Sequence, residues 1–513
     1  MNSLVKSLNP SIENKFEIQK NKLLIVALYY LYIPLAIFLC TWLKFWIGLP
    51  LTLLLGVSPV LLCKDSQNNI VSKNNTKSVI FTSRQLYLTI IVLLAWVVLS
   101  GIGGYVWQNR WDHSFRNAVF NDLVNRPWPV ADSENVLTYY IGFWLPSAAV
   151  AKITGAMWLG RLCQLLYGFM GIVLAFLLTV EKIGKMRLRY LIPFIFFSGL
   201  DIIGIFISGG SIPRNFHLEL WSPLAFWESN TTLLFWVYNQ AIPSWVATII
   251  LLTTGLHKGL PALTLCFLTI SAPFSVVGLF PLALYYIIRR SVLSRTWLKG
   301  LKSFFTPVNI LSLLGALPVM LYFKFNYQTE TYISFHLLTT LVGVKDFLII
   351  ILIEVLVFIP FLYKQLKYNT EFYILFFTSI LCLFIHMGSS TDFNSRVELP
   401  LNFFMTTQIM IYISQLEKKP MMTRKLFFIV SSLAIITPIL EMSRVIYQSI
   451  KLPKTQYYSI EKESIFEFDV LRHNFVADSV INRTEPPLGF ILFNYPQPAE
   501  NNNKKHSIYR DGK

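Results

Sequence analysis

Long apolar runs recur along the whole chain and limit its fold more than any other feature. The runs are about 17 to 25 residues long, the length that a helix needs to cross a ~30 Å hydrocarbon core, and they end at Lys, Arg or polar clusters. Only 14% of the residues are charged, against roughly 25% in an average soluble domain. Strands of a membrane barrel would alternate apolar and polar residues instead. The sequence therefore predicts an all-α, polytopic integral membrane protein.

The runs indicate about 13 transmembrane helices, within a range of roughly 11 to 14. Residues 137–155 are interpreted as a re-entrant or interfacial helix, and residues 260–288 as a hairpin broken at Ser271-Ala272-Pro273. Full crossings there would leave the basic segments 182–189 and 289–302 outside, against the positive-inside rule. Single spans are expected at residues 23–43, 45–63, 86–106, 162–180, 190–208, 233–255, 305–323, 347–363, 372–387, 401–416 and 426–445.

The distribution of Lys and Arg sets the orientation. Only Lys44 separates the first two spans, so they form a hairpin, and the N-terminal tail shares a compartment with the loop 64–84. Both segments are basic, which marks their side as cytoplasmic. We therefore expect a plasma-membrane protein with a cytoplasmic N-terminus. Residues 1–84 hold the tail, hairpin and basic loop, residues 85–445 form the transmembrane domain, and the polar tail 446–513 is extracytoplasmic, with a disordered end at 499–513.

Composition and motifs exclude several other classes. The net charge of +17 comes mostly from short loops, and no basic patch with interleaved aromatics indicates nucleic-acid binding. The sequence has no Walker-type phosphate loop, no HExxH, no GxSxG and no Cys/His metal cluster, which argues against nucleotide chemistry and zinc hydrolysis. The cysteines lie in or beside apolar runs and are interpreted as small core residues: Cys40, Cys63, Cys163, Cys266 and Cys382.

Ionisable side chains collect in four segments that this topology places outside. They are residues 109–130 (NRWDHSFRNAVFNDLVNRPWPV), 208–221 (SGGSIPRNFHLELW), 227–245 (WESNTTLLFWVYNQAIPSW) and 388–400 (GSSTDFNSRVELP). The external loops as a whole are expected at 107–158, 209–232, 324–346 and 388–400. An outward cavity is predicted, lined by Asp112, His113, Asp122, Arg214, His217, Glu219, Asp392, Arg396 and Glu398. Asn239 and Gln240 need partners if buried, which the hydroxyls of a sugar would supply.

Several of these residues also have a purely structural interpretation. Asp112 with Arg116, and Asp392 with Arg396, are i,i+4 pairs that would stabilise a helix turn by roughly 0.2–0.5 kcal/mol. His113, like His217, could be a hydrogen-bonded structural histidine.

Three further carboxylates lie inside or near the ends of spans. Asp201, Glu354 and Glu441 are functional candidates by default, because an intramembrane carboxylate is expensive. The stretch GLDIIG around Asp201 equally suits a hydrogen-bond site between helices. Asp201 is therefore kept outside the predicted site.

The arrangement resembles the GT-C superfamily of polyprenyl-phosphate-sugar-dependent glycosyltransferases. The likeness rests on many helices, an acidic residue just after a span in the first large external loop, a following helix parallel to the membrane, and basic residues in later external loops. The stretches 109–130, 228–245 and 391–400 are also similar to a group of functionally uncharacterised bacterial multi-span proteins. The sequence departs from the family in two ways: Asp112 is followed by His113 where many members have two adjacent acids, and two extra spans precede the loop.

The resemblance implies transfer of a sugar from a polyprenyl-phosphate carrier to an extracytoplasmic acceptor, which is a glycan, a lipid or a protein. Asp112 would be the general base of an inverting reaction, with Asp122 as its competitor and His113 sharing the proton work. Arg214 and Arg396, with Arg116 or His217, would hold the phosphate. A divalent cation, Mg²⁺ or Mn²⁺, stays open as a cofactor.

Two alternatives remain at this point. One is a polysaccharide polymerase or ligase with a lipid-linked oligosaccharide donor, in which cations matter more than a base. The other is a transporter or flippase for lipid-linked sugars, which would place its polar groups near the bilayer midplane and ideally contain an internal repeat. The sequence has no convincing repeat, and its polar clusters lie at one face.

Overall fold

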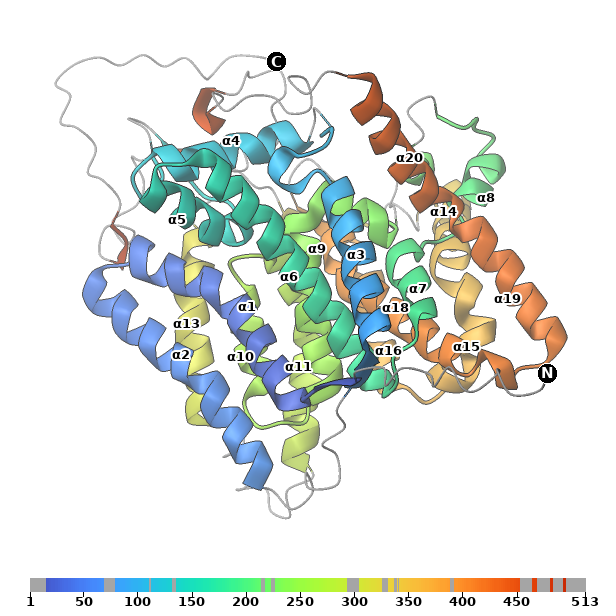
Figure 1. Cartoon of the computed structure of the whole chain (residues 1–513), viewed down its shortest axis with the longest axis horizontal. Helices are drawn as coiled ribbons and strands as arrows, with labels where there is room; N and C mark the ends of the chain where they lie inside the picture. Colours follow the sequence, from blue (N-terminus) through green and yellow to red (C-terminus); the bar gives the residue numbers. More distant parts are fainter. Residues whose placement is uncertain are drawn as a thin grey trace, which may run out of the picture.

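The structure is a computed structural model that describes residues 15–68, 79–109, 112–131, 135–213, 217–222, 227–292, 304–324, 331–335, 339, 341–387, 392–452, 464–467, 480–482 and 492–494. Helices dominate it, and in the described part of the chain nine are long and apolar enough to cross a membrane. The predicted all-α, polytopic membrane class is confirmed at this level. The helices pack into one bundle, with helix α9 (Asn230–Thr254) at its centre (Figure 1).

The chain begins with the predicted helix hairpin. Helices α1 (Lys20–Trp42) and α2 (Phe45–Asn68) pack side by side, and the turn between them is at Leu43 and Lys44. Strand β1 (Lys15–Ile18), which precedes α1, pairs antiparallel with β2 (Val79–Thr82), which follows α2. This pairing places the N-terminal tail and the loop after α2 on the same side, as predicted.

Two short helices follow the third span and lie at one end of the bundle. Helix α3 (Ser83–Leu99) leads to α4 (Asp112–Asn125), which packs on α5 (Leu145–Thr154). At about 1.5 Å per residue, the ten-residue α5 covers only ~15 Å, half of a hydrocarbon core. By itself it is too short to span, and the re-entrant or interfacial placement of residues 137–155 stays a prediction. The chain then enters the bundle as α6 (Met157–Ile183) (Figure 1). We call this end of the bundle the α4 end.

The predicted hairpin at residues 260–288 is present with unequal arms. Helix α10 (Leu260–Leu268) has nine residues, and α11 (Pro273–Val292) has twenty, so only the second arm is long enough to span. The chain turns at residues 269–272, where Pro273 can begin a helix because its first turn needs no N–H donor. The carbonyl of Ile270 in this turn accepts a hydrogen bond from Gly142 N at 3.1 Å.

Two expected spans are interrupted. Residues 190–208 form α7 (Leu191–Phe196) and α8 (Asp201–Ile207), with a break between them. Residues 347–363 run through α14 (Leu341–Ile350), a π-helical turn (Ile351–Val355), a 3-10 turn (Leu356–Phe358) and α15 (Ile359–Leu366). The two irregular segments share one backbone hydrogen bond, in which Leu200 N donates to Ile353 O at 3.1 Å. Irregular backbone at membrane depth needs such internal partners.

The remaining helices complete the bundle around α9. They are α13 (Pro307–Lys324), α16 (Thr370–Cys382), α17 (Asp392–Val397), α18 (Leu399–Ser414), α19 (Met421–Ala434) and α20 (Ile436–Lys451). Trp245 of α9 stacks on Trp96 of α3 and on Phe403 of α18, which ties three helices together at the core. Strands β4 (Thr331–Ile333) and β5 (Ile385–Met387) pair beside the bundle.

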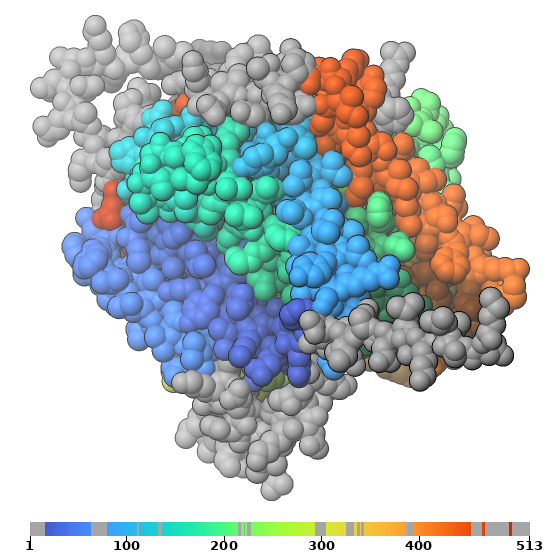
Figure 2. Space-filling view, viewed as in Figure 1, coloured from blue at the N-terminus to red at the C-terminus, as the bar shows by residue number. Residues whose placement is uncertain are grey.

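Described segments of the C-terminal tail pack onto the transmembrane domain. Strand β6 (Val480–Asn482) pairs with β3 (Asn135–Leu137), and Asn494 N donates to Trp42 O at 2.8 Å beside the α1–α2 turn. A 3-10 turn, Ile465–Glu467, lies against α4. The tail therefore reaches the α4 end at several points (Figures 1 and 2). The expected disordered stretch 499–513 lies outside the described residues.

Candidate functional site

The first part of the site is the beginning of α4, which carries Asp112 and His113. Asn109 Oδ1 accepts the backbone N–H of Asp112 at 2.8 Å and so caps the helix. His113 is buried, and its Nε2 lies 2.8 Å from the carbonyl oxygen of Phe235, so this nitrogen donates and Nδ1 carries the lone pair. Within the described residues, Nδ1 has no hydrogen-bond partner.

Arg116, one turn further along α4, is a buried cation that is only partly satisfied. Its side chain is 6% exposed, and its Nη2 lies 3.7 Å from Asp112 Oδ1. The guanidinium also lies over the ring of Tyr238, 5.6 Å from its centroid. Nε and Nη1 have no hydrogen-bond partner among the residues described. A buried donor without an acceptor is costly, and a guanidinium fork suits an oxyanion.

A second arginine, Arg444 of α20, belongs to a cluster around Glu441, and its charge also acts on His113. Glu441 of α20 accepts hydrogen bonds from His217, from Trp236 Nε1 at 3.2 Å and from Arg444. The Arg444 guanidinium lies over the rings of Trp236, at 5.1 Å, and Trp107, at 5.9 Å. Arg444 is not among the residues predicted for the site, although its i,i+3 spacing from Glu441 is a signal in the sequence.

Burial and these two arginines act together on His113. Burial, followed by the positive charges of Arg116 and Arg444, lowers the pKa of His113 to about 3, although the hydrogen bond to Phe235 acts in the opposite direction. The imidazole is therefore neutral at pH 7 and lies within electrostatic reach of two guanidinium groups.

The predicted cation Arg396 is already paired. It forms a buried ion pair with Glu228, whose backbone carbonyl accepts Asn402 Nδ2. Nearby Glu398 is buried, and burial and the charge of Glu228 raise the pKa of its carboxyl well above the usual range despite Arg396. Sequence reasoning did not identify Glu228, because its partner is 168 residues away.

Glu219 links the segment before α9 to the start of that helix, because its Oε1 accepts Ser229 N at 2.8 Å.

The side chains of two other predicted site residues are not described. Arg214 lies outside the described residues, and only the backbone of Asp392, at the start of α17, is described.

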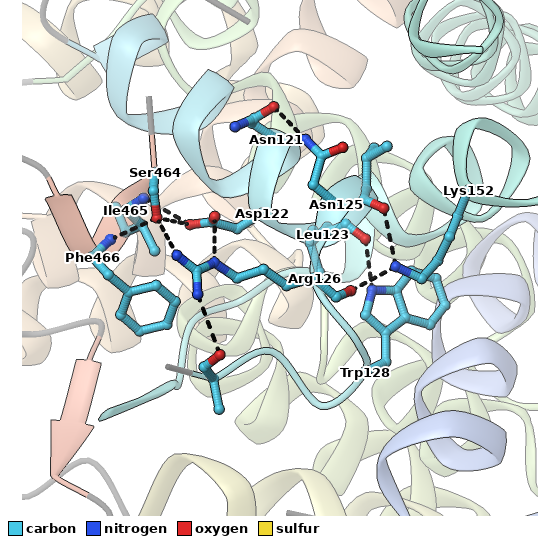
Figure 3. A network of polar contacts seen from close by, with 12 residues as sticks. Asn121, Asp122, Leu123, Asn125, Arg126, Trp128, Lys152, Ser464, Ile465 and Phe466 are labelled. Atoms are coloured by element: carbon cyan, nitrogen blue, oxygen red, sulfur yellow. Dashed lines mark hydrogen bonds and ion pairs between the residues drawn. The ribbon is translucent and has the colours of Figure 1, made fainter. Parts of the chain in front are cut away.

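Asp122 belongs to a different network, which holds the tail on α4 (Figure 3). Its Oδ1 accepts Arg126 Nε at 2.9 Å, and its Oδ2 accepts Ser464 Oγ at 3.0 Å and Ile465 N at 2.7 Å. Arg126 also lies over the ring of Phe466, 4.7 Å from its centroid. Both carboxylate oxygens of Asp122 thus have structural partners. We call Asp122, Arg126, Ser464, Ile465 and Phe466 the tail latch.

Asn239 and Gln240 lie in the middle of α9, just after a non-helical residue, Val237. Each is 1% exposed. In the described part of the protein, neither amide atom of Asn239 has a hydrogen-bond partner, and Gln240 Oε1 has none. Both side chains are therefore buried with polar atoms that still require hydrogen-bond partners.

Three of the four segments predicted to face outward contact the fourth, residues 227–245, which contains the first half of α9. Residues 109–130 contact it through His113 and Phe235, residues 208–221 through Glu219 and Ser229, and residues 388–400 through Arg396 and Glu228. Among the described residues, no three His, Cys, Asp or Glu side chains are arranged to hold a metal ion.

No family model, curated protein or solved structure matches the chain.

Proposed function

We propose that the protein is a membrane glycosyltransferase of GT-C type, which transfers a sugar from a polyprenyl-phosphate carrier to an extracytoplasmic acceptor. One observation carries the proposal: Arg116 is buried, its Nε and Nη1 have no partner among the described residues, and it lies one helix turn from the partly exposed carboxylate of Asp112. An unpaired buried guanidinium favours an anion such as a phosphate, and the adjacent carboxylate favours proton transfer.

The groups fit an inverting displacement. The acceptor hydroxyl oxygen forms a bond to the anomeric carbon as the bond from that carbon to the phosphate oxygen breaks, and the electron pair leaves with the phosphate. Asp112 takes the hydroxyl proton. Arg116, together with Arg444, whose charge also acts on His113, stabilises the charge on the leaving phosphate, and each of these roles contributes about 10²-fold or more.

The neutral histidine and the amides of α9 fit the uncharged parts of the substrates. His113 Nδ1 carries a lone pair that can accept a hydrogen bond from a hydroxyl group, while Nε2 is occupied by Phe235 O. Asn239 and Gln240 offer buried donor and acceptor atoms, and sugar hydroxyls would satisfy them. We assign sugar recognition to this pair.

The experiment that tests the proposal compares Asp112→Asn with Asp122→Asn in the purified protein. The change at Asp112 keeps size but removes the base, so transfer from a polyprenyl-phosphate sugar should fall by at least about 10²-fold while donor binding survives. Asp122→Asn is the matched control for loss of transfer through disturbance of α4, because its carboxylate holds the tail latch on that helix. Wild-type transfer in the Asp112 variant would refute Asp112 as the base, and if both variants retain transfer the polymerase or ligase alternative is favoured.

The interrupted spans favour a second candidate, transport of a lipid-linked sugar. Transporters use broken helices at their binding sites, and α7–α8 and the π-helical turn are breaks of this kind. Proteoliposomes separate the two functions: a transferase modifies an acceptor on its own side of the bilayer, whereas a transporter moves the labelled lipid across without forming a product.

A further inference from the structure

A group of carboxyl side chains lies beside the candidate site without a basic partner. Asp201 begins α8, Glu354 lies on the π-helical turn, and Glu219 lies on the 3-10 turn Glu219–Trp221. Each is 1% exposed. Within the described part of the chain, none of the three forms an ion pair with Lys, Arg or His. We call Asp201, Glu219 and Glu354 the carboxyl cluster.

One oxygen of each carboxyl group is satisfied by a neutral donor. Asp201 Oδ2 accepts Ser198 Oγ at 3.1 Å and Thr437 Oγ1 at 2.8 Å. Glu354 Oε1 accepts Trp221 Nε1 at 3.0 Å, and Glu219 Oε1 accepts a backbone N–H.

The other oxygen of each group has no donor in the described structure. These atoms are Asp201 Oδ1, Glu354 Oε2 and Glu219 Oε2. The Asp201 and Glu354 carboxyl groups are within hydrogen-bonding reach of each other. Two carboxyl groups can form a hydrogen bond only if one of them carries a proton, because a carboxylate has no donor. The unpaired oxygens therefore point to a bound proton.

The backbone is shaped to allow this approach. At the α7–α8 break, a Cβ on Gly199 would lie 1.5 Å from Glu354 Oε2, so only glycine leaves room for the carboxyl group. Leu200 N bonds to Ile353 O, which fixes the break against the π-helical turn. Single π-helical turns occur frequently at functional sites.

The surrounding charges do not neutralise the cluster. Glu228 and Glu441, whose charges act on Glu219, are themselves paired with cations: Glu228 with Arg396, and Glu441 with His217 and Arg444. Burial, and then the charges of Asp201, Glu228 and Glu441, raise the pKa of Glu219 well above its usual range. Like charges this close in a buried site cannot all be ionised.

We propose that Asp201 and Glu354 share one proton at neutral pH, and that the carboxyl cluster is a proton-binding site next to the candidate transfer site. This goes beyond glycosyl transfer and does not depend on it. Loss of the shared proton would place two negative charges at the contact between the α7–α8 break and the π-helical turn, and would push these segments apart.

The first test uses the unmodified full-length protein in lipid nanodiscs. Dicyclohexylcarbodiimide, an apolar carbodiimide, reacts with protonated carboxyl groups, and mass spectrometry then locates the modified residue. We expect modification of Asp201 or Glu354 at pH 7, falling as the pH rises and unchanged by Na⁺. Protection by Na⁺ would overturn the proposal in favour of a metal-cation site.

The second test is infrared spectroscopy, which detects the C=O stretch of protonated carboxyl groups whether or not a reagent can reach them. Asp201→Asn and Glu354→Gln should each remove the same band at pH 7. Asp122→Asn is the control, because Asp122 is equally buried but paired with Arg126, and Glu398→Gln identifies any contribution from that residue. Absence of a protonated band in the wild-type protein, or its persistence in both cluster variants, overturns the proposal, and the wild-type spectrum decides even if a variant fails to fold.

Discussion

At the residue scale, the environment of His113 connects the stability of the protein with binding at the proposed site. Its pKa is lowered to about 3 by burial, and Arg116 and Arg444 add to this effect. The unfolded chain binds a proton near pH 6.5, the usual pKa of histidine, whereas the folded protein does not. An anion bound between the two arginines would offset their charges and raise the pKa of His113 again.

This difference predicts a loss of stability in acid. A lowered folded-state pKa contributes stability that is complete above about pH 6.5 and is lost as the pH falls toward 3. The loss should approach about 1.4 kcal/mol per pH unit for this one group. Denaturant unfolding across this window should give a flatter pH profile for His113→Gln than for the wild type. Equal slopes would show that His113 is not buried in its neutral form.

Arg116 provides a second prediction at this scale. If its Nε and Nη1 bind the phosphate, Arg116→Gln should weaken binding of a polyprenyl phosphate by about 10- to 100-fold, since a hydrogen bond to a charged group is worth roughly 1.5–3 kcal/mol. Arg116→Lys should recover only part of the affinity, because lysine lacks the planar fork. Arg126→Gln, in the tail latch, is the matched control, and equal weakening in this variant would mean that the loss comes from disturbing α4.

Local spacing in the sequence predicts neighbouring partners of the candidate site residues better than it predicts distant ones. Local spacing correctly suggested Asp112 with Arg116, because an i,i+4 pair needs only a helix. It assigned Arg396 to phosphate and Asp122 to chemistry, whereas both side chains have buried structural partners far away in the sequence, Glu228 and Ser464. Such partners come from tertiary packing, which no local pattern contains.

At the element scale, α4 is held by contacts near both of its ends. Asn109 caps its first turn, while Lys152 Nζ donates to the carbonyl oxygens of Val124 and Arg126, at 3.0 and 2.6 Å, at its last turn (Figure 3). A cation at the C-terminal carbonyls stabilises a helix. The tail latch adds a contact with Ser464, so the segment that carries Asp112 and His113 depends on residues near the end of the chain.

The latch predicts an effect of the tail on α4. Asp122→Asn should destabilise the protein by about 1–3 kcal/mol, because Arg126 and Ser464 lose a charged acceptor. Hydrogen–deuterium exchange should increase in residues 112–125 and 464–467 together. Ser464→Ala should reproduce a smaller increase in both segments. Faster exchange in 464–467 alone would show that the tail does not stabilise α4.

The lengths of apolar runs predicted the positions of the helices but not their interruptions. The breaks at residues 197–200 and 351–358 lie inside runs that are long enough to span. Their cause is a tertiary contact, in which Glu354 packs on Gly199 and Leu200 N bonds to Ile353 O. The predictions for α5 and the α10–α11 hairpin came from charge bias, which concerns the side that a loop occupies and does not require knowledge of packing.

At the scale of the whole molecule, contacts between distant parts of the chain agree with the sides assigned from charge. β1 pairs with β2 at one end of the bundle. At the other end, Asn494 bonds to the α1–α2 turn and Ser464 bonds to α4, so the tail and the proposed site share a side (Figure 1). These contacts fix relative sides, while the assignment of one side to the cytoplasm rests on Lys and Arg.

Single-cysteine labelling in intact cells tests this topology. In a background with the native cysteines replaced, cysteines at Asn125 and Asn494, which are exposed at the α4 end, should react with a membrane-impermeant maleimide. Cysteines at Lys185 and Arg289, which are exposed near the opposite ends of α6 and α11, should react only after the membrane is permeabilised. Asn494 serves as an internal check on Asn125. Because both lie at the α4 end, cysteines at these two positions must label from the same side whichever way the protein is oriented. If cysteines at Lys185 and Asn125 label from the same side, the arrangement of the helix bundle is wrong. If instead positions 185 and 289 label from outside and positions 125 and 494 only after permeabilisation, the fold stands but its orientation is reversed. Asp112 and its arginines would then lie on the cytoplasmic side, where an extracytoplasmic acceptor could not reach them.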